Sequence, residues 1–417
     1  ALVVLIAPAA QALGRDATAY GEDFVRQGSH WPEGGPVPAA PVTEASGADA
    51  ERIAARLDAM ELEDGPYGGE LAEPLTDLAR HYRGQGDYQQ ALGYYRRALH
   101  NVRVNDGLYS ERQVPLVREL LNLYRLAGEY EALDDRYDYF FRLYGSGQPP
   151  FDDVRLRATL EYLRWQREAH RRGLRTGERD LLRLYEHNRD LLALVRAVPT
   201  VSGQWQREFV FSQMRNLYLL QREIEPLVDS SSLGVASAFP NSANSDRDFA
   251  RDRLEAIDRT AVSRGRQLLE ELLDSLPGVD QYGRALVHRE LGDWYQFNDS
   301  WRRAREHYRQ AIGLLQAGGR QDLVEQWWAE PVELPDNGTF WRGHDVEGER
   351  VAVKAVLSVS ERGRPKVDQV MVVSADDESA ARRLRRQLAD TRFRPAFRDG
   401  DPVAMDSVER IYEVYRD

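Results

Sequence analysis

The fold is decided by the stretch Leu291–Ile312, "LGDWYQFNDSWRRAREHYRQAI". It carries no residue that obviously does chemistry, but its small and aromatic residues follow a regular spacing. The same spacing occurs far earlier in the chain, in "LTDLARHYRGQGDYQQALGYYRRAL" at residues 75–99. Two distant segments that share one pattern indicate an internal repeat.

We call the shared pattern the repeat template and define it by corresponding positions in three copies. In the first copy these positions are Leu75, Leu78, Ala79, Tyr82, Gly86, Tyr88, Ala91, Tyr95 and Ala98. In the opening stretch and the residues just before it they are His288, Leu291, Gly292, Tyr295, Asp299, Trp301, Ala304, Tyr308 and Ala311. A degraded copy has Val117, Leu120, Leu121, Tyr124, Gly128, Tyr130, Leu133, Tyr137 and Phe140.

The small residues of the template predict closely packed helix pairs. A small side chain at Ala79 or Gly292 lets a second helix approach, and Ala91 and Ala304 are its counterparts on that second helix. A single pair cannot bury its own apolar face, so neighbouring pairs are expected to stack into a superhelix.

The template resembles the tetratricopeptide repeat, a helix-turn-helix unit of about 34 residues. The resemblance implies a concave groove, lined by the first helix of each pair, that binds a protein or peptide segment. By register, the groove positions are Thr76, Arg80, Arg83, Arg118, Asn122 and Arg125. Arginine followed four residues later by asparagine, as at Arg118 and Asn122, resembles the clamp with which some members hold a peptide carboxylate. A generic polar groove is the alternative interpretation.

Composition and charge limit the classes of function. The 417 residues are 42% hydrophobic and 30% charged, which is typical of a soluble globular protein. The net charge of -12 opposes attraction to phosphate backbones, so nucleic acid is not the expected partner. The chain contains no cysteine, which excludes disulfides, thiolate metal sites and cysteine nucleophiles.

The first residues, "ALVVLIAPAAQALG", form a short apolar run followed by Ala10-Gln11-Ala12, the small-x-small pattern of a signal-peptidase site. The run is shorter than the roughly 20 apolar residues that span a bilayer. We therefore expect secretion into the periplasm, with a mature chain that begins near Leu13 and has no integral membrane span. A frayed apolar terminus or an uncleaved anchor is the alternative.

Shifts in composition and periodicity along the chain predict its domains. The expected segments are a signal-peptide remnant at 1–12, a flexible tether rich in proline, glycine and alanine at 13–50, a helical-repeat domain at 51–318 with a loop at 229–245, a connecting segment at 319–345, and a small α+β domain at 346–417.

The last segment changes from helical periodicity to alternation. Val351, Val353 and further alternate residues predict a hairpin with a turn at 361–364, followed by a helix at 377–389 and a last strand at 407–415. This order, with "RFRPAFRDGDPV" before the last strand, resembles the C-terminal domain of TonB-type energy transducers. The match lies at Arg392, Phe393, Arg394, Pro395, Ala396, Gly400, Pro402 and Val403. It implies a Gram-negative-type envelope location and a docking module.

Catalytic motifs are absent from the sequence. The eight histidines form no close pair of the His-Glu-x-x-His type, and we predict no metal or cofactor. His288 occupies a packing position of the template and is expected to be structural. The loop at 335–345 gathers Asp336, Trp341, His344 and Asp345, which is either a site or a turn-rich connection between domains.

The sequence thus predicts a mainly α protein, with a superhelix of tetratricopeptide-like repeats followed by a small α+β domain in the order ββαβ. The expected function is that of a non-enzymatic periplasmic adaptor for protein or peptide partners in the cell envelope. One alternative is an energy transducer anchored at the inner membrane, and another is an enzyme with a site near His344. The sequence does not indicate an oligomeric state.

Overall fold

The computed structural model describes residues 18–19, 24–26, 47–224, 242–340, 350–373 and 378–415. The chain divides into two compact units. The N-terminal unit comprises residues 35–174 and 345–347, and the C-terminal unit comprises residues 1–34, 175–344 and 348–417. The division at Leu174 falls inside the range 51–318 that the sequence assigns to one helical-repeat domain.

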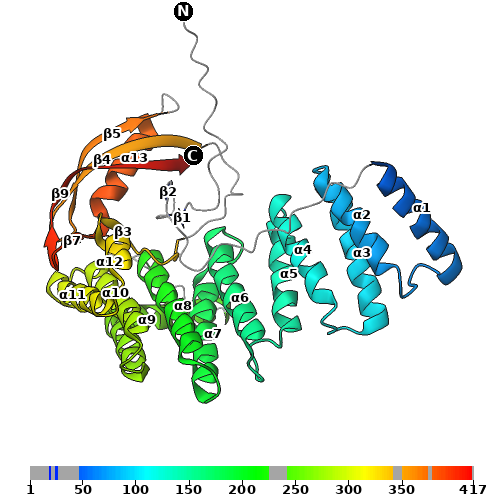
Figure 1. Ribbon diagram of the computed structural model, residues 1–417, viewed down its shortest axis with the longest axis horizontal. Coiled ribbons are helices and arrows are strands. Elements are labelled where there is room, and N and C mark those ends of the chain that lie inside the picture. The colour runs from blue at the N-terminus through cyan, green and yellow to red at the C-terminus, as the bar shows by residue number, and fades with distance from the viewer. Residues whose placement is uncertain are drawn as a thin grey trace, which may run out of the picture. The chain divides into compact units, whose positions relative to one another are not determined.

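The N-terminal unit is built from helices that pack on their neighbours in chain order (Figure 1). These helices are α1 (Gly47–Asp64), α2 (Ala72–Gly84), α3 (Tyr88–Asp106), α4 (Gln113–Leu126), α5 (Tyr130–Leu143) and α6 (Asp153–Arg171). The carboxylate of Asp87 caps α3 by accepting from the backbone N–H of Gln90 at 3.1 Å. By these bounds, the first copy of the template forms the pair α2–α3, and the degraded copy forms the pair α4–α5.

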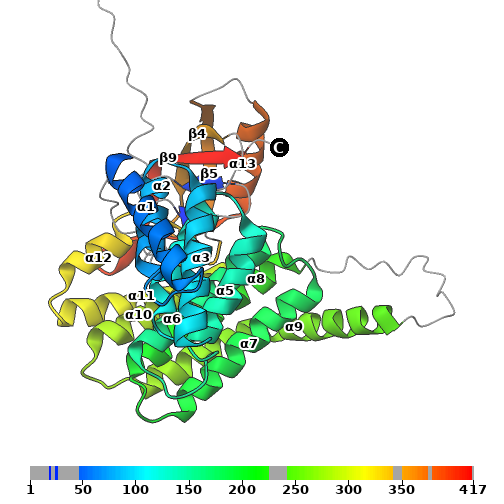
Figure 2. The same ribbon diagram turned by 90° about the vertical axis from the view of Figure 1, so that its right-hand side faces the viewer.

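The C-terminal unit begins with further helices that also pack in sequence. They are α7 (Glu178–Ala197), α8 (Gly203–Glu223), α9 (Ser242–Ser275), α10 (Gln281–Phe297), α11 (Trp301–Ala317) and α12 (Gln321–Trp328). Figure 2 shows α9 extending well past its neighbours. Helix α9 begins inside the loop expected at 229–245, and the rest of that loop lies outside the described residues. The third copy of the template forms the pair α10–α11.

A sheet with a helix on one face completes the C-terminal unit (Figure 1). Its elements are β4 (Arg350–Val359), β5 (Pro365–Val372), α13 (Glu378–Asp390) and β9 (Met405–Tyr415), with β9, β4 and β5 adjacent and antiparallel. The alternation along β4 is as expected: Val351, Val353 and their alternate successors are buried against Leu384 and Leu388 of α13. The segment before β9 contains three short strands, β6 (Arg392–Arg394), β7 (Ala396–Arg398) and β8 (Asp401–Val403). Strand β6 pairs with β3 (Val332–Leu334), and β7 pairs with β8.

The expected flexible tether at 13–50 requires correction. It contains β1 (Thr18–Ala19) and β2 (Phe24–Arg26), and β2 pairs with β9 so that Phe24 lies opposite Val414. The physical reason is that one edge of β9 offers backbone groups that β4 does not use, and an added strand satisfies them. Helix α1 also begins at Gly47, before the expected end of the tether.

The packing role of the small template residues is confirmed. Ala79, Ala91 and Ala304 are fully buried, and Gly292 is buried as well. A Cβ added to Gly292 would lie 2.4 Å from a ring carbon of Tyr308, so α10 and α11 touch at this glycine. The close approach of the two helices depends on the missing side chain.

The template also fixes the turn between the two helices of each pair. Gly86 and Gly128, at the same template position, have φ values of 79° and 71°, in the left-handed region where glycine carries no steric cost. In the last copy this position is Asp299, with φ of 58°. A left-handed aspartate costs about 1–2 kcal/mol relative to a relaxed backbone. The last pair therefore accepts strain that the other two avoid.

Replacing Gly292 with alanine should lower the free energy of unfolding by about 1–3 kcal/mol, because the added Cβ must displace the Tyr308 ring. Gly313 is the matched control: it lies in α11, and a Cβ there would meet no atom within 4 Å. Gly313→Ala should raise stability by about 0.5–1 kcal/mol through helix propensity. Urea unfolding followed by circular dichroism measures both, and equal effects of the two variants would contradict the close packing.

Candidate functional site

The arginines predicted to line the groove form ion pairs within the N-terminal unit. Three of them, one on α2 and two on α4, each bind a glutamate on the first helix of the next pair along the chain. The pairs and their shortest nitrogen–oxygen distances are Arg83–Glu119 at 2.6 Å, Arg118–Glu161 at 3.2 Å and Arg125–Glu168 at 2.6 Å. These contacts tie α2 to α4 and α4 to α6, so these guanidinium groups have carboxylate partners from the chain itself.

Glu168 is the most deeply buried of these glutamates, with a side chain that is 2% exposed. It accepts two hydrogen bonds from Arg125, at 2.6 and 2.9 Å, and one from Arg172 at 2.8 Å. Burial raises the pKa of Glu168, but the charges and hydrogen bonds of Arg125 and Arg172 lower it by more, so the net pKa lies below its ordinary value. The carboxylate is therefore ionised at neutral pH and holds Arg125 in place.

The other predicted groove residues make local contacts or face solvent. The Thr76 hydroxyl donates to the carbonyl of Ala72 at 2.7 Å, within its own helix. Arg80 is exposed and pairs with Asp77 at 3.1 Å, while Asn122 is half-buried. In the predicted carboxylate clamp of Arg118 and Asn122, the arginine therefore already has a glutamate partner within the chain.

The loop expected to hold an alternative site is described only in part. Trp341, His344 and Asp345 lie outside the described residues. Asp336 is described, and its carboxylate lies 3.7 Å from the guanidinium of Arg394. Within the described ranges, no group of three or more histidine, aspartate or glutamate side chains is close enough to hold a metal ion. None of the helices described is long and apolar enough to cross a membrane.

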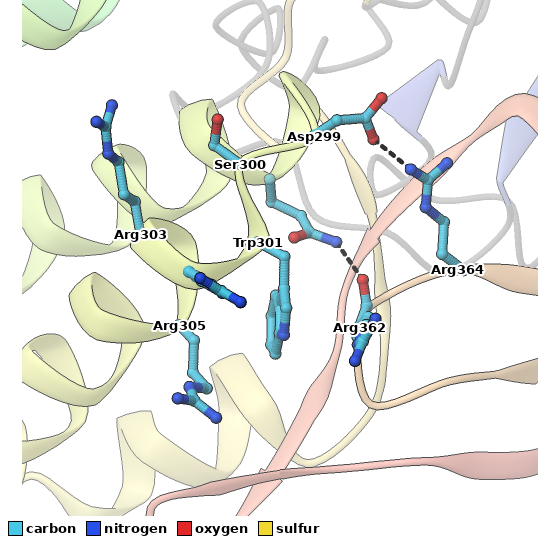
Figure 3. Close-up of a pocket in the computed structure, with 9 residues that line it drawn as sticks. Asp299, Ser300, Trp301, Arg303, Arg305, Arg362 and Arg364 are labelled. Atoms are coloured by element: carbon cyan, nitrogen blue, oxygen red, sulfur yellow. Dashed lines mark hydrogen bonds and ion pairs between the residues drawn. The ribbon is translucent and has the colours of Figure 1, made fainter.

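In the C-terminal unit, the last helical pair and the β4–β5 turn border a hollow of about 700 Å³ (Figure 3). Arginines from both elements dominate its lining. The lining residues are Gln296, Asp299, Ser300, Trp301, Arg302, Arg303, Arg305, Arg362 and Arg364. Asp293, Gln296 and Asp299 of the last helical pair also make polar contacts with the β4–β5 turn and with β6.

The strongest of these contacts is a buried ion pair between Asp293 of α10 and Arg394 of β6. The guanidinium donates two parallel hydrogen bonds to the carboxylate, at 2.8 and 2.5 Å, and a third to the carbonyl of Trp327 at 3.3 Å. The Tyr308 hydroxyl also donates to Asp293, at 2.9 Å. Burial lowers the pKa of Arg394, but the charge of Asp293 outweighs it, and the net pKa is raised. Arg394 thus keeps its charge, and both side chains of the pair are enclosed.

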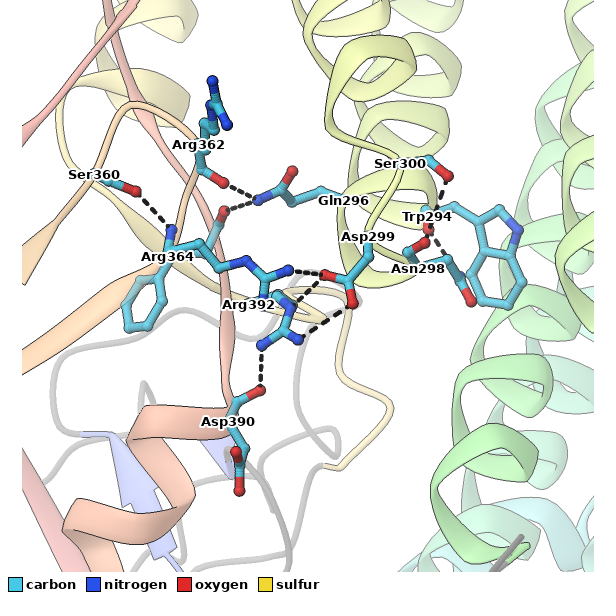
Figure 4. Close-up of polar contacts among 11 residues, drawn as sticks. Trp294, Gln296, Asn298, Asp299, Ser300, Ser360, Arg362, Arg364, Asp390 and Arg392 are labelled. Atoms are coloured by element: carbon cyan, nitrogen blue, oxygen red, sulfur yellow. Dashed lines mark hydrogen bonds and ion pairs between the residues drawn. The ribbon is translucent and has the colours of Figure 1, made fainter.

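Gln296, one turn further along α10, bonds to two backbone segments of the sheet region (Figure 4). Its side-chain N–H donates to the carbonyl of Arg362 at 2.7 Å and to that of Phe393 at 3.0 Å. Gly363, which follows Arg362 in the turn, has φ of 70°. A Cβ there would lie 2.0 Å from the Phe393 carbonyl oxygen. Only glycine fits this position.

Asp299, in the α10–α11 turn, joins two arginines of the sheet region (Figure 4). It accepts from Arg364 at 2.8 Å and from Arg392 at 2.7 and 3.3 Å. Hydrogen bonding from Arg392 and the charges of both arginines lower the pKa of Asp299 although burial opposes the shift. The aspartate with the left-handed backbone in the last template copy therefore binds the sheet region to the α10–α11 turn.

Asp293, Gln296 and Asp299 escaped the sequence analysis because each depends on a partner far along the chain. One signal was available for Asp299, since it replaces the glycine found at Gly86 and Gly128. A charged residue at a position that needs a left-handed backbone is unfavourable unless its side chain is used. For Asp293 the sequence offered no such signal, because Glu290 and Gln296, one turn before and after it on the same side of the helix, are polar as well.

His288 and His307 lie against each other across the α10–α11 pair, with 3.1 Å between their Nδ1 atoms. Burial, together with the neighbouring His307 and Arg284, lowers the pKa of His288 to about 4. Burial likewise lowers the pKa of His307. Both imidazoles are therefore held neutral at pH 7, which agrees with the structural role expected for His288.

No protein-family model matches the sequence, and no curated protein matches it.

Replacing Arg394 with glutamine should lower the free energy of unfolding by about 3–5 kcal/mol, because Asp293 keeps a buried charge without its partner. The matched control is Arg309→Gln, since Arg309 pairs with Asp401 on the surface and its loss should cost under about 1 kcal/mol. The double variant Asp293→Leu/Arg394→Met should recover much of the loss. Urea unfolding measures all three, and similar losses for Arg394→Gln and Arg309→Gln would refute the importance of burial.

Acidification should destabilise the C-terminal unit through His288. Its pKa is about 4 in the folded chain and near 6.5 when unfolded, so the unfolded chain binds more protons between these values. The stabilising effect of neutral His288 is complete above pH 6.5 and falls by roughly 3 kcal/mol as pH drops to 4.

His288→Leu should remove this part of the pH dependence, since Leu75 occupies the same template position in the first copy. His100→Gln changes an exposed histidine and should leave the dependence as in the unaltered chain. Unfolding free energies at pH 7 and pH 4.5 provide the measurement. Parallel pH profiles for the unaltered chain and His288→Leu would show that His288 is not responsible.

Proposed function

We propose that this chain is a non-enzymatic adaptor of the cell envelope. Helical pairs hold a segment of one partner protein, and the C-terminal α+β region, residues 350–415, engages a second component. The observation that carries the proposal is the buried contact of Asp293 with Arg394, which fixes that region to the last helical pair. An adaptor needs such a contact within its C-terminal unit, because a docking region that moved freely on its supporting helices would hold its partner in no defined orientation.

The proposal also assigns the helical pairs and the C-terminal region to two known types of domain. The pairs α2–α3, α4–α5 and α10–α11 act as tetratricopeptide-like repeats in a superhelical stack, and β4, β5, α13 and β9 act as a domain of the TonB C-terminal type. The burial of Ala79, Ala91, Gly292 and Ala304 supports the first assignment. The small-x-small pattern at Ala10–Ala12 supports a periplasmic location.

Within the N-terminal unit, the ion pairs of the first helices determine which side chains meet a partner. Arg83 and Arg125 hold α2, α4 and α6 together and keep the surface rigid, which reduces the entropy cost of binding. Arg80, which is exposed, and Asn122, which is half-buried, contact the bound segment directly. Arg118 contributes by exchanging Glu161 for a partner carboxylate.

A photo-crosslinking amino acid at position 80 or 122 should join the chain to one discrete envelope protein in intact cells. The same group at Gln90, which is exposed on the second helix of the first pair, is the control and should give no such product. Mass spectrometry of the crosslinked species measures the outcome. If all three positions gave the same products, or if positions 80 and 122 gave none, the first-helix surface would not be the binding surface.

A further inference from the structure

The hollow in the C-terminal unit brings together arginines from two elements that are far apart in sequence. Arg302, Arg303 and Arg305 come from the first turns of α11, and Arg362 and Arg364 come from the β4–β5 turn. Trp301 is half-buried, and its indole projects into the same space as the side chain of Arg362 (Figure 3). The polar contacts of Gln296 and Asp299 hold the two walls at a fixed separation.

The hollow carries an uncompensated positive charge. Asp299 is the one acidic residue in its lining, and Arg364 and Arg392 already occupy its carboxylate. Among the residues that the structure describes, no carboxylate lies within ion-pair distance of Arg302, Arg305 or Arg362. This contrasts with the net charge of -12 of the whole chain.

The position of these arginines is unfavourable for stability. The first turn of α11 contains no acidic residue, and positive charges there oppose the helix dipole. A sequence under selection for stability alone would place acids in this turn. Charges kept where they destabilise a helix are typical of a site that is completed by a ligand of opposite sign.

We propose that this hollow binds a short acidic peptide segment of a partner protein. Arg302, Arg305 and Arg362 hold its carboxylates, because the guanidinium group donates paired hydrogen bonds that match a carboxylate. Trp301 provides an apolar surface for the neighbouring part of the peptide. The volume of about 700 Å³ suits a few residues of a peptide.

This site is separate from the first-helix surface of the N-terminal unit and goes beyond the function proposed above. Either site can fail without the other, since crosslinking at position 80 or 122 reports only on the N-terminal unit. The acidic-peptide site names the chemistry of a partner for the C-terminal unit, which the adaptor proposal leaves open.

The test measures binding of a fluorescein-labelled hexaglutamate peptide to the full chain by fluorescence anisotropy at low salt. The double variant Arg302→Gln/Arg305→Gln should bind at least about tenfold more weakly, because it loses two charge-assisted contacts. The matched control Arg385→Gln/Arg386→Gln removes the same charge from exposed positions on α13, away from the hollow, and should bind within about twofold of the unaltered chain.

Three results would overturn the proposal. They are no saturable binding of hexaglutamate, an equal loss in both double variants, and tighter binding of a labelled hexathymidylate that the Arg302→Gln/Arg305→Gln variant abolishes. Circular dichroism establishes that each variant is folded. If the first double variant does not fold, Arg362→Gln tests the same wall from an exposed turn, and unchanged peptide affinity in that variant would equally refute the site.

Discussion

The buried ion pair between Asp293 and Arg394 is the contact on which the C-terminal unit depends. Its position follows from the repeat template, because Gly292 lets the ring of Tyr308 lie against α10, and the hydroxyl of that same tyrosine donates to Asp293. The carboxylate therefore accepts hydrogen bonds from both Tyr308 and Arg394 of β6. A glycine chosen for helix packing thus also sets the geometry of a charged contact. Since neither charge is tolerated alone in a buried site, the sheet region cannot slide along α10 without losing both.

The last copy of the template differs from the other two in what its turn does. Gly86 and Gly128 only reverse the chain, and their left-handed backbone carries no cost. Asp299 accepts strain at the same position and gains Arg364 and Arg392 as partners. One substitution in a packing repeat has therefore produced a docking point. This division suits an adaptor, in which the end of a helical array must be specialised for the element that follows it.

Local periodicity was sufficient to predict the helical pairs, the burial of Ala79 and Gly292, and the alternating face of β4, because each depends on neighbours in sequence. The pairing of β2 with β9 was missed, since nothing in residues 24–26 indicates which distant edge they join. The prediction for the groove arginines was incomplete for the same reason, because it did not include their glutamate partners on the next first helix. One regularity was nevertheless visible: Arg118 and Arg125 each bind a glutamate 43 residues further along the chain. Opposite charges at a fixed separation on successive first helices indicate ion pairs between those helices.

Arginine is the dominant cation of this chain, so its presence alone carries little information about function. What distinguishes one arginine from another is whether the chain supplies a carboxylate at the right distance. Arg83 and Arg125 receive one from the next first helix, and Arg394 receives one from α10. Such pairs fix helices and the sheet region in place, and their charges are satisfied internally. Of the arginines around Trp301, Arg364 pairs with Asp299, whereas the described part of the chain brings no carboxylate within ion-pair distance of Arg302, Arg305 or Arg362. Donors that are gathered around one hollow without an internal acceptor are available to an external one, and this difference, more than the number of arginines, is the reason for proposing a binding site there.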